Sequence, residues 1–411
     1  MGIRGLRKFI DKYAPSAIKE LKIEELQNKT IAFDTSILIY QFVIAIRNSG
    51  VDLTNDNGKI TSHIHAIIMK TLSFLKKKIN PIFVFDGKPP EIKMDTLKER
   101  IKVRQNAIAQ LETDNNLETD KKISLLKQSV VVTSRQMDEC REILKLMGIP
   151  VIDASQEADS QCAYLSKLKL VDAIASEDMD LLTFGTEKLL RNMNTNKIIE
   201  ITLSKILEET ELTQYQFIDL CIMLGSDYCP TIDGIGMTRA YSLIKKYESI
   251  ENIINANIKI GKNNVIISSE FKNRYQLARE YFKNPPINKN FPQIKWNNPD
   301  FDSLKNILIT KYSYSPITVD KLLVKPLTGG HYKAIVGKNN EQVLIDREFS
   351  IHMNILNIKK DKNDYDDQFL DYIDDNIINI YSPDPDIESV NNLLKITDKN
   401  NIKNLVNIKT I

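Results

Sequence analysis

The 411-residue sequence has few of the residues that build disulfide frameworks or zinc sites. Its four cysteines never form a C-x-x-C pair, and only four histidines accompany them. Neither a disulfide framework nor a zinc site is therefore expected. Reduced cysteines predict a protein that stays inside the cell and is not secreted.

Long apolar runs and targeting signals are also missing. The most apolar stretch, residues 31–46, contains Asp34 and several uncharged polar residues, so it is not expected to span a membrane. The opening MGIRGLRKFIDKYAP has no apolar core followed by small residues, as a secretory signal would have. Leu6 stands where a myristoylation pattern needs Ser or Thr. No membrane partner is expected.

The charge is nearly balanced overall but unevenly distributed. Residues 361–388 contain ten acidic residues and one basic residue, a net of −9, so the rest of the chain carries +11 of the total of +2. A basic body with an acidic tail segment favours a polyanionic partner for the body, although solvated lysine surfaces are common. The 42% of hydrophobic and 27% of charged residues are typical of globular domains.

Short apolar runs alternate with helical patterns in the first half of the chain. Four β-rich runs that contain or end in aspartate lie at residues 30–34, 81–86, 148–153 and 171–178. Helical patterns lie at residues 37–46, 61–78 and 138–147. This alternation predicts an α/β fold with a mostly parallel sheet flanked by helices. In such sheets, functional groups gather beyond the carboxyl ends of the strands.

Seven acidic residues follow these strands or a later helix. They are Asp34, Asp86, Glu157, Asp159, Asp178, Asp180 and Asp227. If they converge, they repel one another by several kcal/mol per pair at about 4 Å, so we expect cations to bind. All-oxygen ligands favour Mg²⁺ or Mn²⁺. Two such ions about 4 Å apart activate a water and stabilise both oxygens of a cleaved phosphodiester. Each aspartate taken alone could instead cap a helix.

A charged helical segment, residues 89–136, separates the second and third strands. Lys93 and Arg100, seven residues apart, are expected on one helical face nearest the carboxylates. Such cations could neutralise a scissile phosphate or clamp a single strand, whereas most other basic residues of the segment fit a solvated surface.

A glycine turn joins two later helices predicted at residues 213–224 and 237–247. Gly234 and Gly236 would let the backbone approach a phosphate, and the next helix offers free N–H groups. Arg239 on that helix favours contact with a duplex backbone. An ordinary helix connector is the alternative.

Seven motifs in order resemble the structure-specific flap endonucleases of eukaryotes and archaea, a family of the 5′ nuclease superfamily. They are MGIRGL, IAFDTSILIYQFVIAIR, VFDGKPP, MGIP followed by QEAD, ASEDMDLLTFG, LCIMLGSDYCP and IDGIGMTRA. The similarity weakens around KWNNPD and is not recognisable after about residue 325. The Asn-, Lys- and Ile-rich composition fits an AT-rich genome, such as that of a large DNA virus or a protist.

The resemblance implies a PIN-like nuclease core in five regions. The regions are an N-terminal nuclease region (1–105), a helical arch (89–136), an internal nuclease region (137–257) with a helix–two-turn–helix element at 217–250, a C-terminal part of the core (258–325), and a divergent extension (326–411). The last ~45 residues are expected to be disordered.

The resemblance also implies roles for the site residues. The seven carboxylates match the family's ligands for two metal ions, with Asp180 also catalytic. Lys93 and Arg100 match the basic pair beside the scissile phosphate. The family usually has Glu where Asp159 stands, so the shorter side chain is expected to alter the metal preference.

DNA contacts are implied at thirteen positions. They are Gly2, Tyr40, Arg47, Thr61, Lys70, Arg104, Glu157, Arg191, Gly225, Asp227, Gly234, Gly236 and Arg239. Tyr40 matches an aromatic residue that stacks on a nucleobase, and Arg47 and Thr61 match the grip on a one-nucleotide 3′ flap. Gly225, Gly234 and Gly236 match the backbone that approaches the duplex and that also binds K⁺ in relatives, and Gly2 matches the family's start near the active site.

Two departures from the family pattern stand out. Asp233 occupies a position that is often basic, which should weaken phosphate attraction there. The C-terminus lacks a Q-x-x-[ILM]-x-x-aromatic-aromatic motif for docking on a sliding clamp, since Gln368 is followed three residues later by Asp371. Dependence on a clamp is therefore left open.

The sequence as a whole predicts a monomeric, Mg²⁺-dependent 5′ flap endonuclease with 5′→3′ exonuclease activity. Its partners would be 5′-flap and nicked duplex DNA in replication and repair, in the nucleus or in a viral replication compartment. The alternatives are an exonuclease or a bubble or junction nuclease of the same superfamily, or a non-catalytic DNA-binding paralogue.

Overall fold

The computed structural model describes most of the chain up to residue 319. The described residues are 2–48, 60–114, 118–195, 197–256, 258–260, 263–264, 266–317 and 319. The predicted extension 326–411, with its acidic segment and its expected disorder, lies outside the described residues.

A seven-stranded sheet forms the centre of the molecule, in the order β1-β7-β6-β5-β2-β3-β4. Its strands are β1 (Ile18–Leu21), β2 (Thr30–Asp34), β3 (Asn80–Phe85), β4 (Val151–Asp153), β5 (Ala173–Ala175), β6 (Lys188–Arg191) and β7 (Ile198–Thr202). The five strands from β6 to β4 are parallel, whereas β7 and β1 are antiparallel to their neighbours. The mostly parallel α/β fold is therefore confirmed.

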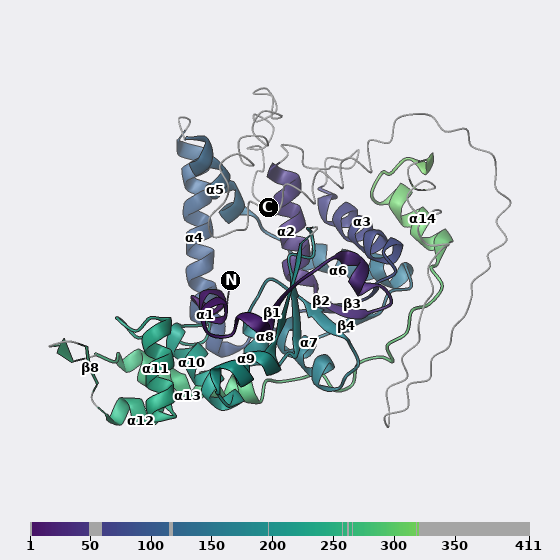
Figure 1. The fold of residues 1–411 in the computed structure, drawn as a ribbon. Coiled ribbons are helices and arrows are strands. Elements are labelled where there is room, and N and C mark those ends of the chain that lie inside the picture. The colour runs from purple at the N-terminus through teal and green to yellow at the C-terminus, as the bar shows by residue number, and fades with distance from the viewer. Residues whose placement is uncertain are drawn as a thin grey trace.

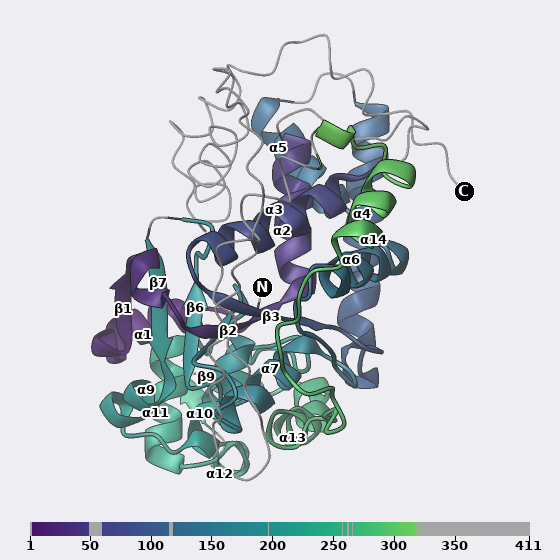
Figure 2. The ribbon, with the colours of Figure 1, turned by 90° about the vertical axis from the view of Figure 1, so that its right-hand side faces the viewer.

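The central strands are buried along their whole length. Every residue of β2 and β3 is buried, because helices cover both faces of the sheet. Helices α2 (Thr35–Asn48), α3 (Ser62–Lys76) and α6 (Ser134–Leu146) pack on one side, and α7 (Ala158–Lys167) packs on the other (Figures 1 and 2). Burial on both faces explains why the sequence shows continuous apolar runs rather than alternation.

Two helices rise away from the sheet on one side of the carboxyl ends (Figure 1). They are α4 (Met94–Thr113) and α5 (Thr119–Ser129), and α4 follows a short 3₁₀ turn, η3 (Glu91–Lys93). Ala107 is buried in α4, and most of that helix faces solvent. The helical character predicted for residues 89–136 is thus confirmed for this arch.

A second group of helices lies on the opposite side of the sheet from the arch tip (Figure 1). It contains α10 (Gln214–Leu224), α11 (Met237–Tyr247), α12 (Ile250–Asn255) and α13 (Ser269–Lys283). The helices α10 and α11 confirm the two helices predicted around the glycine turn. Near them lies a small hairpin, β8 (Lys259–Ile260) and β9 (Asn263–Asn264).

The remaining short elements complete the core. They are α1 (Leu6–Tyr13), η1 (Pro15–Ala17), η2 (Ile23–Leu26), α8 (Asp180–Thr183), α9 (Leu203–Thr210) and α14 (Phe301–Thr310). The segment between α13 and α14 runs along the core, where the buried Trp296 donates its indole N–H to the carbonyl of Pro81 at 3.0 Å. None of the helices in the described part of the chain is long and apolar enough to cross a bilayer.

Candidate active site

Seven carboxylates, the predicted ligand set, gather beyond the carboxyl ends of the parallel strands. Asp34 ends β2, Asp86 follows β3, and Asp178 and Asp180 follow β5. Glu157 precedes α7, Asp159 lies in its first turn, and Asp227 follows α10. Because β3, β2 and β5 are adjacent and parallel, their carboxyl ends meet at one edge. We call these seven residues the carboxylate cluster.

Burial and repulsion by neighbouring carboxylates raise the pKa values of three members of the cluster, Asp34, Asp159 and Asp180. Burial raises the pKa of Asp34 well above its usual range, and the charge of Asp86 raises it further. The pKa of Asp159 is raised by burial and then by the charge of Asp34, and that of Asp180 by burial and then by Asp178. The side chains are thus close enough to repel one another, as the sequence predicted.

Several oxygens of the cluster are satisfied by backbone N–H groups. Asp34 Oδ1 accepts hydrogen bonds from the N–H groups of Ser36 and Ile37 at 3.1 and 3.3 Å. Asp86 Oδ1 accepts from the N–H group of Ala158 at 2.8 Å. These bonds hold Asp34 at the start of α2 and Asp86 at the start of α7, and the opposite oxygen of each carboxylate takes no part in them.

Two buried oxygens of the cluster have no hydrogen-bond partner. They are Oδ1 of Asp159 and Oδ1 of Asp180. Such oxygens are costly unless a proton, a water or a cation satisfies them, and an all-oxygen donor set suits Mg²⁺ or Mn²⁺. Among the described residues, no three His, Cys, Asp or Glu side chains are already arranged as a metal cage. The carboxylate oxygens are ligands of the kind that the expected ions prefer, but the described side chains do not already surround a common point.

The N-terminal backbone packs directly against the cluster at Gly2. A Cβ at this position would lie 2.2 Å from Asp178 Oδ1 and 2.8 Å from Asp180 Oδ1. The φ angle of +92° also favours glycine. The structure therefore places Gly2 at the predicted site.

The arch delivers two cations to the cluster. Lys93 Nζ contacts Glu157 Oε1 and lies 3.2 Å from Asp227 Oδ2. Arg100 donates to both oxygens of Asp227, at 2.6 and 2.8 Å. Burial alone would lower the pKa of Lys93, but the charges of Glu157 and Asp227 outweigh it and the pKa is raised. Both predicted arch cations thus meet the carboxylates.

Two tyrosines orient Glu157, and the sequence analysis identified neither. The hydroxyl of Tyr228 donates to Glu157 Oε2, and the hydroxyl of Tyr281 donates to the same oxygen at 3.1 Å. Burial, and then the charge of Glu157, raises the pKa of both tyrosines, so their hydroxyls stay protonated as donors. Tyr228 could have been noticed because it follows Asp227, whereas Tyr281 lies on α13 and gives no local signal.

Four of the predicted DNA contacts lie on α2, immediately before α3, or on the arch. The Tyr40 hydroxyl on α2 donates to the carbonyl of Lys127 on α5 at 3.3 Å. Arg104 is half-buried on α4. Arg47 belongs to the last turn of α2, and the buried Thr61 immediately precedes α3.

Two of the predicted phosphate contacts, Lys70 and Arg191, have protein neighbours in this structure. Lys70 is 3% exposed, with its Nζ 5.3 Å and 5.2 Å from the ring centres of Phe42 and Phe74. Arg191 Nη2 pairs with Glu177 at 3.1 Å. Their contacts with phosphate stay predictions.

The glycines of the α10–α11 turn serve different purposes. Gly225 has φ +95°, and a Cβ there would lie 2.3 Å from Thr231 Cγ2, so it is required by internal packing. Gly236 precedes α11, and a Cβ there would meet nothing within 4 Å. Gly234 has φ +75°, and its carbonyl accepts from Arg239 Nη1 at 2.7 Å. The open backbone at Gly236 remains accessible to a partner.

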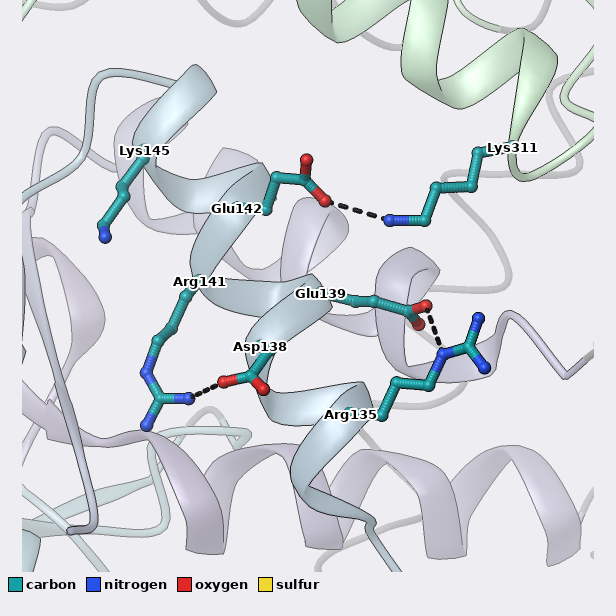
Figure 3. Close-up of a pocket in the computed structure, with 7 residues that line it drawn as sticks. All are labelled: Arg135, Asp138, Glu139, Arg141, Glu142, Lys145 and Lys311. Atoms are coloured by element: carbon teal, nitrogen blue, oxygen red, sulfur yellow. Dashed lines mark hydrogen bonds and ion pairs between the residues drawn. The ribbon is translucent and has the colours of Figure 1, made fainter.

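A separate groove of ≈550 Å³ lies between α6 and α14 (Figure 3). Its lining residues are Arg135, Asp138, Glu139, Arg141, Glu142, Lys145 and Lys311. Opposite charges pair across it, as between Lys311 and Glu142 at 3.0 Å. None of the predicted site residues lines this groove, so we assign it no part in the active site.

Two family models match the parts of the chain that contain the carboxylate cluster. The XPG N-terminal domain matches residues 1–107, and the XPG I-region matches residues 148–227. The chain is 43% identical over 342 residues to flap endonuclease 1 of Plasmodium knowlesi, with 78% of this chain and 56% of the relative covered. It is 40% identical over 332 residues to flap endonuclease 1-A of Sorghum bicolor, with 79% of this chain and 86% of the relative covered. The chain belongs to the flap endonuclease family.

A solved structure agrees with this family assignment. The catalytic core of Rad2, in complex with a DNA substrate, matches with a TM-score of 0.61 and 26% identity, covering 79% of this chain and 100% of that one. The residues that the two family models match include all seven members of the carboxylate cluster. The chain spans about half the length of the Plasmodium knowlesi and Plasmodium falciparum relatives.

Proposed function

We propose that this chain is a structure-specific nuclease that hydrolyses the phosphodiester at the junction of a 5′ single-stranded flap and duplex DNA. The observation that carries the proposal is the pair of unpartnered oxygens on Asp159 and Asp180, buried at the strand ends beneath the arch cations Lys93 and Arg100. Membership of the flap endonuclease family and the likeness to a DNA-bound Rad2 core support it.

The carboxylate cluster would hold two Mg²⁺ or Mn²⁺ ions. When bound, such a pair activates a water and stabilises the attacking and leaving oxygens of the phosphodiester. Lys93 and Arg100 supply positive charge from the arch, on the side of the cluster from which the single strand would approach. Tyr228 and Tyr281 keep the Glu157 carboxylate in one orientation.

Duplex DNA would lie along the α10–α11 turn. The open backbone at Gly236 and the N-terminus of α11 suit a phosphate, and K⁺ is a further candidate ligand of this turn. Arg239 shapes the turn through Gly234. These contacts read the shape of the backbone rather than base identity, as a flap enzyme requires.

The remaining proposed DNA contacts would act around the cut. Tyr40 would stack on a nucleobase, Arg47 and Thr61 would grip a one-nucleotide 3′ flap, and Arg104 would contact a phosphate. We propose a monomer acting in a DNA-containing compartment of the cell, the nucleus or a viral replication compartment.

A panel of matched DNA substrates tests this function. A 5′ flap, a nicked duplex, a bubble, a four-way junction and a single strand of the same sequence are incubated with the protein and Mg²⁺. We expect the flap to be cut fastest, leaving a 5′-phosphate on the duplex strand and a 3′-hydroxyl on the released flap. Preference for the bubble or junction would assign the chain to another activity of the superfamily. Binding without any cutting would indicate a non-catalytic paralogue.

A further inference from the structure

Arg274 on α13 joins the base of the arch to the turn that carries Asp227. Its Nη2 donates to the carbonyl of Ile92, and its Nε donates to the carbonyl of Tyr228 at 3.2 Å. Its Nη1 lies 3.1 Å from Asp95 Oδ2 at the start of α4. One guanidinium therefore binds two backbone segments and a carboxylate at once.

These contacts lie one residue away from the site on both sides. Ile92 immediately precedes Lys93, and Tyr228 immediately follows Asp227. Lys93 Nζ and Asp227 Oδ2 are 3.2 Å apart. The same two segments are thus joined twice, by Lys93 inside the site and by Arg274 behind it.

We propose that Arg274 is a positioning residue that holds Lys93 in place over the carboxylate cluster. It does not belong to the cluster, and it donates to the backbone carbonyls of Ile92 and Tyr228, so it acts through the backbone. The proposal deepens the proposed function, since Lys93 is assigned to the scissile phosphate there, but the placement of Lys93 can be tested without DNA.

Arginine is suited to this role in a way that lysine is not. The planar guanidinium presents donors in fixed directions, so a single side chain can serve acceptors on different segments at once. The ammonium of a lysine is one compact donor group on a flexible stem and cannot span the same set. If only the positive charge of Arg274 matters, Arg274→Lys should keep Lys93 in its position. If the fixed directions of the guanidinium donors matter, Arg274→Lys should not keep it there.

Chemical labelling tests the position of Lys93 directly. Lys93 is 14% exposed, so acylation by an amine-reactive reagent, followed by mass spectrometry, should be slow in the native protein. We expect Arg274→Met to raise the labelling rate of Lys93 by severalfold, and Arg274→Lys to raise it by nearly as much. Lys272→Met, which removes a charge from an exposed position of the same helix, is the matched control and should leave it unchanged.

Activity measurements then connect position to chemistry. We expect Arg274→Met to lower the single-turnover rate of flap cutting by about 10- to 100-fold, as losing a supporting residue typically does, while flap affinity without metal changes less than about 2-fold. In the Lys93→Ala background, Arg274→Met should have little further effect, because interacting residues are not additive.

The outcomes separate the inference from the function. Unchanged Lys93 labelling in both Arg274 variants, or additive losses with Lys93→Ala, would overturn the positioning role. If Arg274→Met does not fold, Arg274→Lys decides the question by itself. Failure of the native protein to cut any flap would overturn the proposed function, while the labelling result would still stand.

Discussion

At the scale of single residues, the two oxygens of the Glu157 carboxylate have different kinds of partner. Lys93 binds one carboxylate oxygen, and two tyrosine hydroxyls bind the other. The ammonium supplies charge, whereas the neutral hydroxyls fix direction without adding charge. A carboxylate held in this way keeps one orientation when its surroundings change.

Removing one of these hydroxyls should therefore slow the reaction without unfolding the protein. Tyr281→Phe loses the 3.1 Å hydrogen bond to Glu157 but keeps the ring packed against Tyr228 at a centroid distance of 4.9 Å. We expect a loss of about 1 kcal/mol in the free energy of unfolding and a roughly 10-fold slower single-turnover cleavage. Chemical denaturation and rapid-quench kinetics measure the two.

The control for this change is Tyr215→Phe, at an exposed position on α10. It should alter neither the free energy of unfolding nor the single-turnover cleavage rate. Equal effects of the two substitutions would show that the hydroxyl of Tyr281 has no special role at Glu157.

The sequence identified the seven carboxylates but not the residues that support them. Strand ends can be located from local apolar runs, so Asp34, Asp86 and Asp178 could be placed together by topology alone. Tyr281 and Arg274 reach the site only because α13 docks beside α10 and the arch base. No local pattern indicates such docking, because it depends on contacts between residues 46 to 182 positions apart in the sequence.

At the scale of elements, the sequence predicted the strands β2 to β5 and missed β6, β7 and β1 on one side of the sheet. The strands β2 and β3 are buried throughout, have apolar centres and lead into the carboxylates Asp34 and Asp86, which marks them clearly. The strands β1, β6 and β7 are four or five residues long and partly charged or exposed, and they were not predicted. Their antiparallel pairing depends on long-range neighbours rather than on local composition.

The α10–α11 turn allows a test of duplex binding by the backbone. Gly236→Ala places a methyl group in open space with no left-handed φ to strain, so we expect an unchanged melting temperature. If a phosphate approaches this backbone, the methyl group should weaken duplex binding by about 1 kcal/mol or more, read as a shift in Kd at fixed salt.

Gly225→Ala is the contrasting change in the same turn. Its φ of +95° and the 2.3 Å approach to Thr231 Cγ2 should lower stability by about 1–3 kcal/mol. Stable Gly225→Ala protein, or unchanged duplex affinity of Gly236→Ala, would contradict the assignment of the two glycines.

At the scale of the whole molecule, the carboxylate cluster makes stability depend on pH and on metal. Burial and repulsion raise the pKa values of Asp34, Asp159 and Asp180 in the folded protein, while in the unfolded chain they are near 3.9. At a pH between the pKa values of the unfolded chain and those of the folded protein, the folded state binds more protons than the unfolded state. The free energy of unfolding without metal should therefore fall as pH rises through that window.

The melting temperature measured in EDTA should accordingly decrease as pH rises above about 4, where the aspartates of the unfolded chain lose their protons. Mg²⁺ binds deprotonated carboxylates of the folded state, so it should restore more stability at the higher pH. Asp180→Asn removes one of the repelling carboxylates and should flatten the slope in EDTA. A melting temperature that rises over this range in EDTA, or an Asp180→Asn slope equal to that of the native protein, would count against the cluster.

The most direct test of the central claim compares Asp180→Asn with Asp138→Asn. Asp180 is 2% exposed within the cluster, whereas the Asp138 side chain is 71% exposed on α6. Single-turnover cleavage of a 5′ flap in Mg²⁺ is measured beside flap affinity in EDTA. We predict that Asp180→Asn cuts at least about 10³-fold more slowly while binding the flap as tightly as the native protein, and that Asp138→Asn behaves as native. Undiminished cutting by Asp180→Asn would contradict the account.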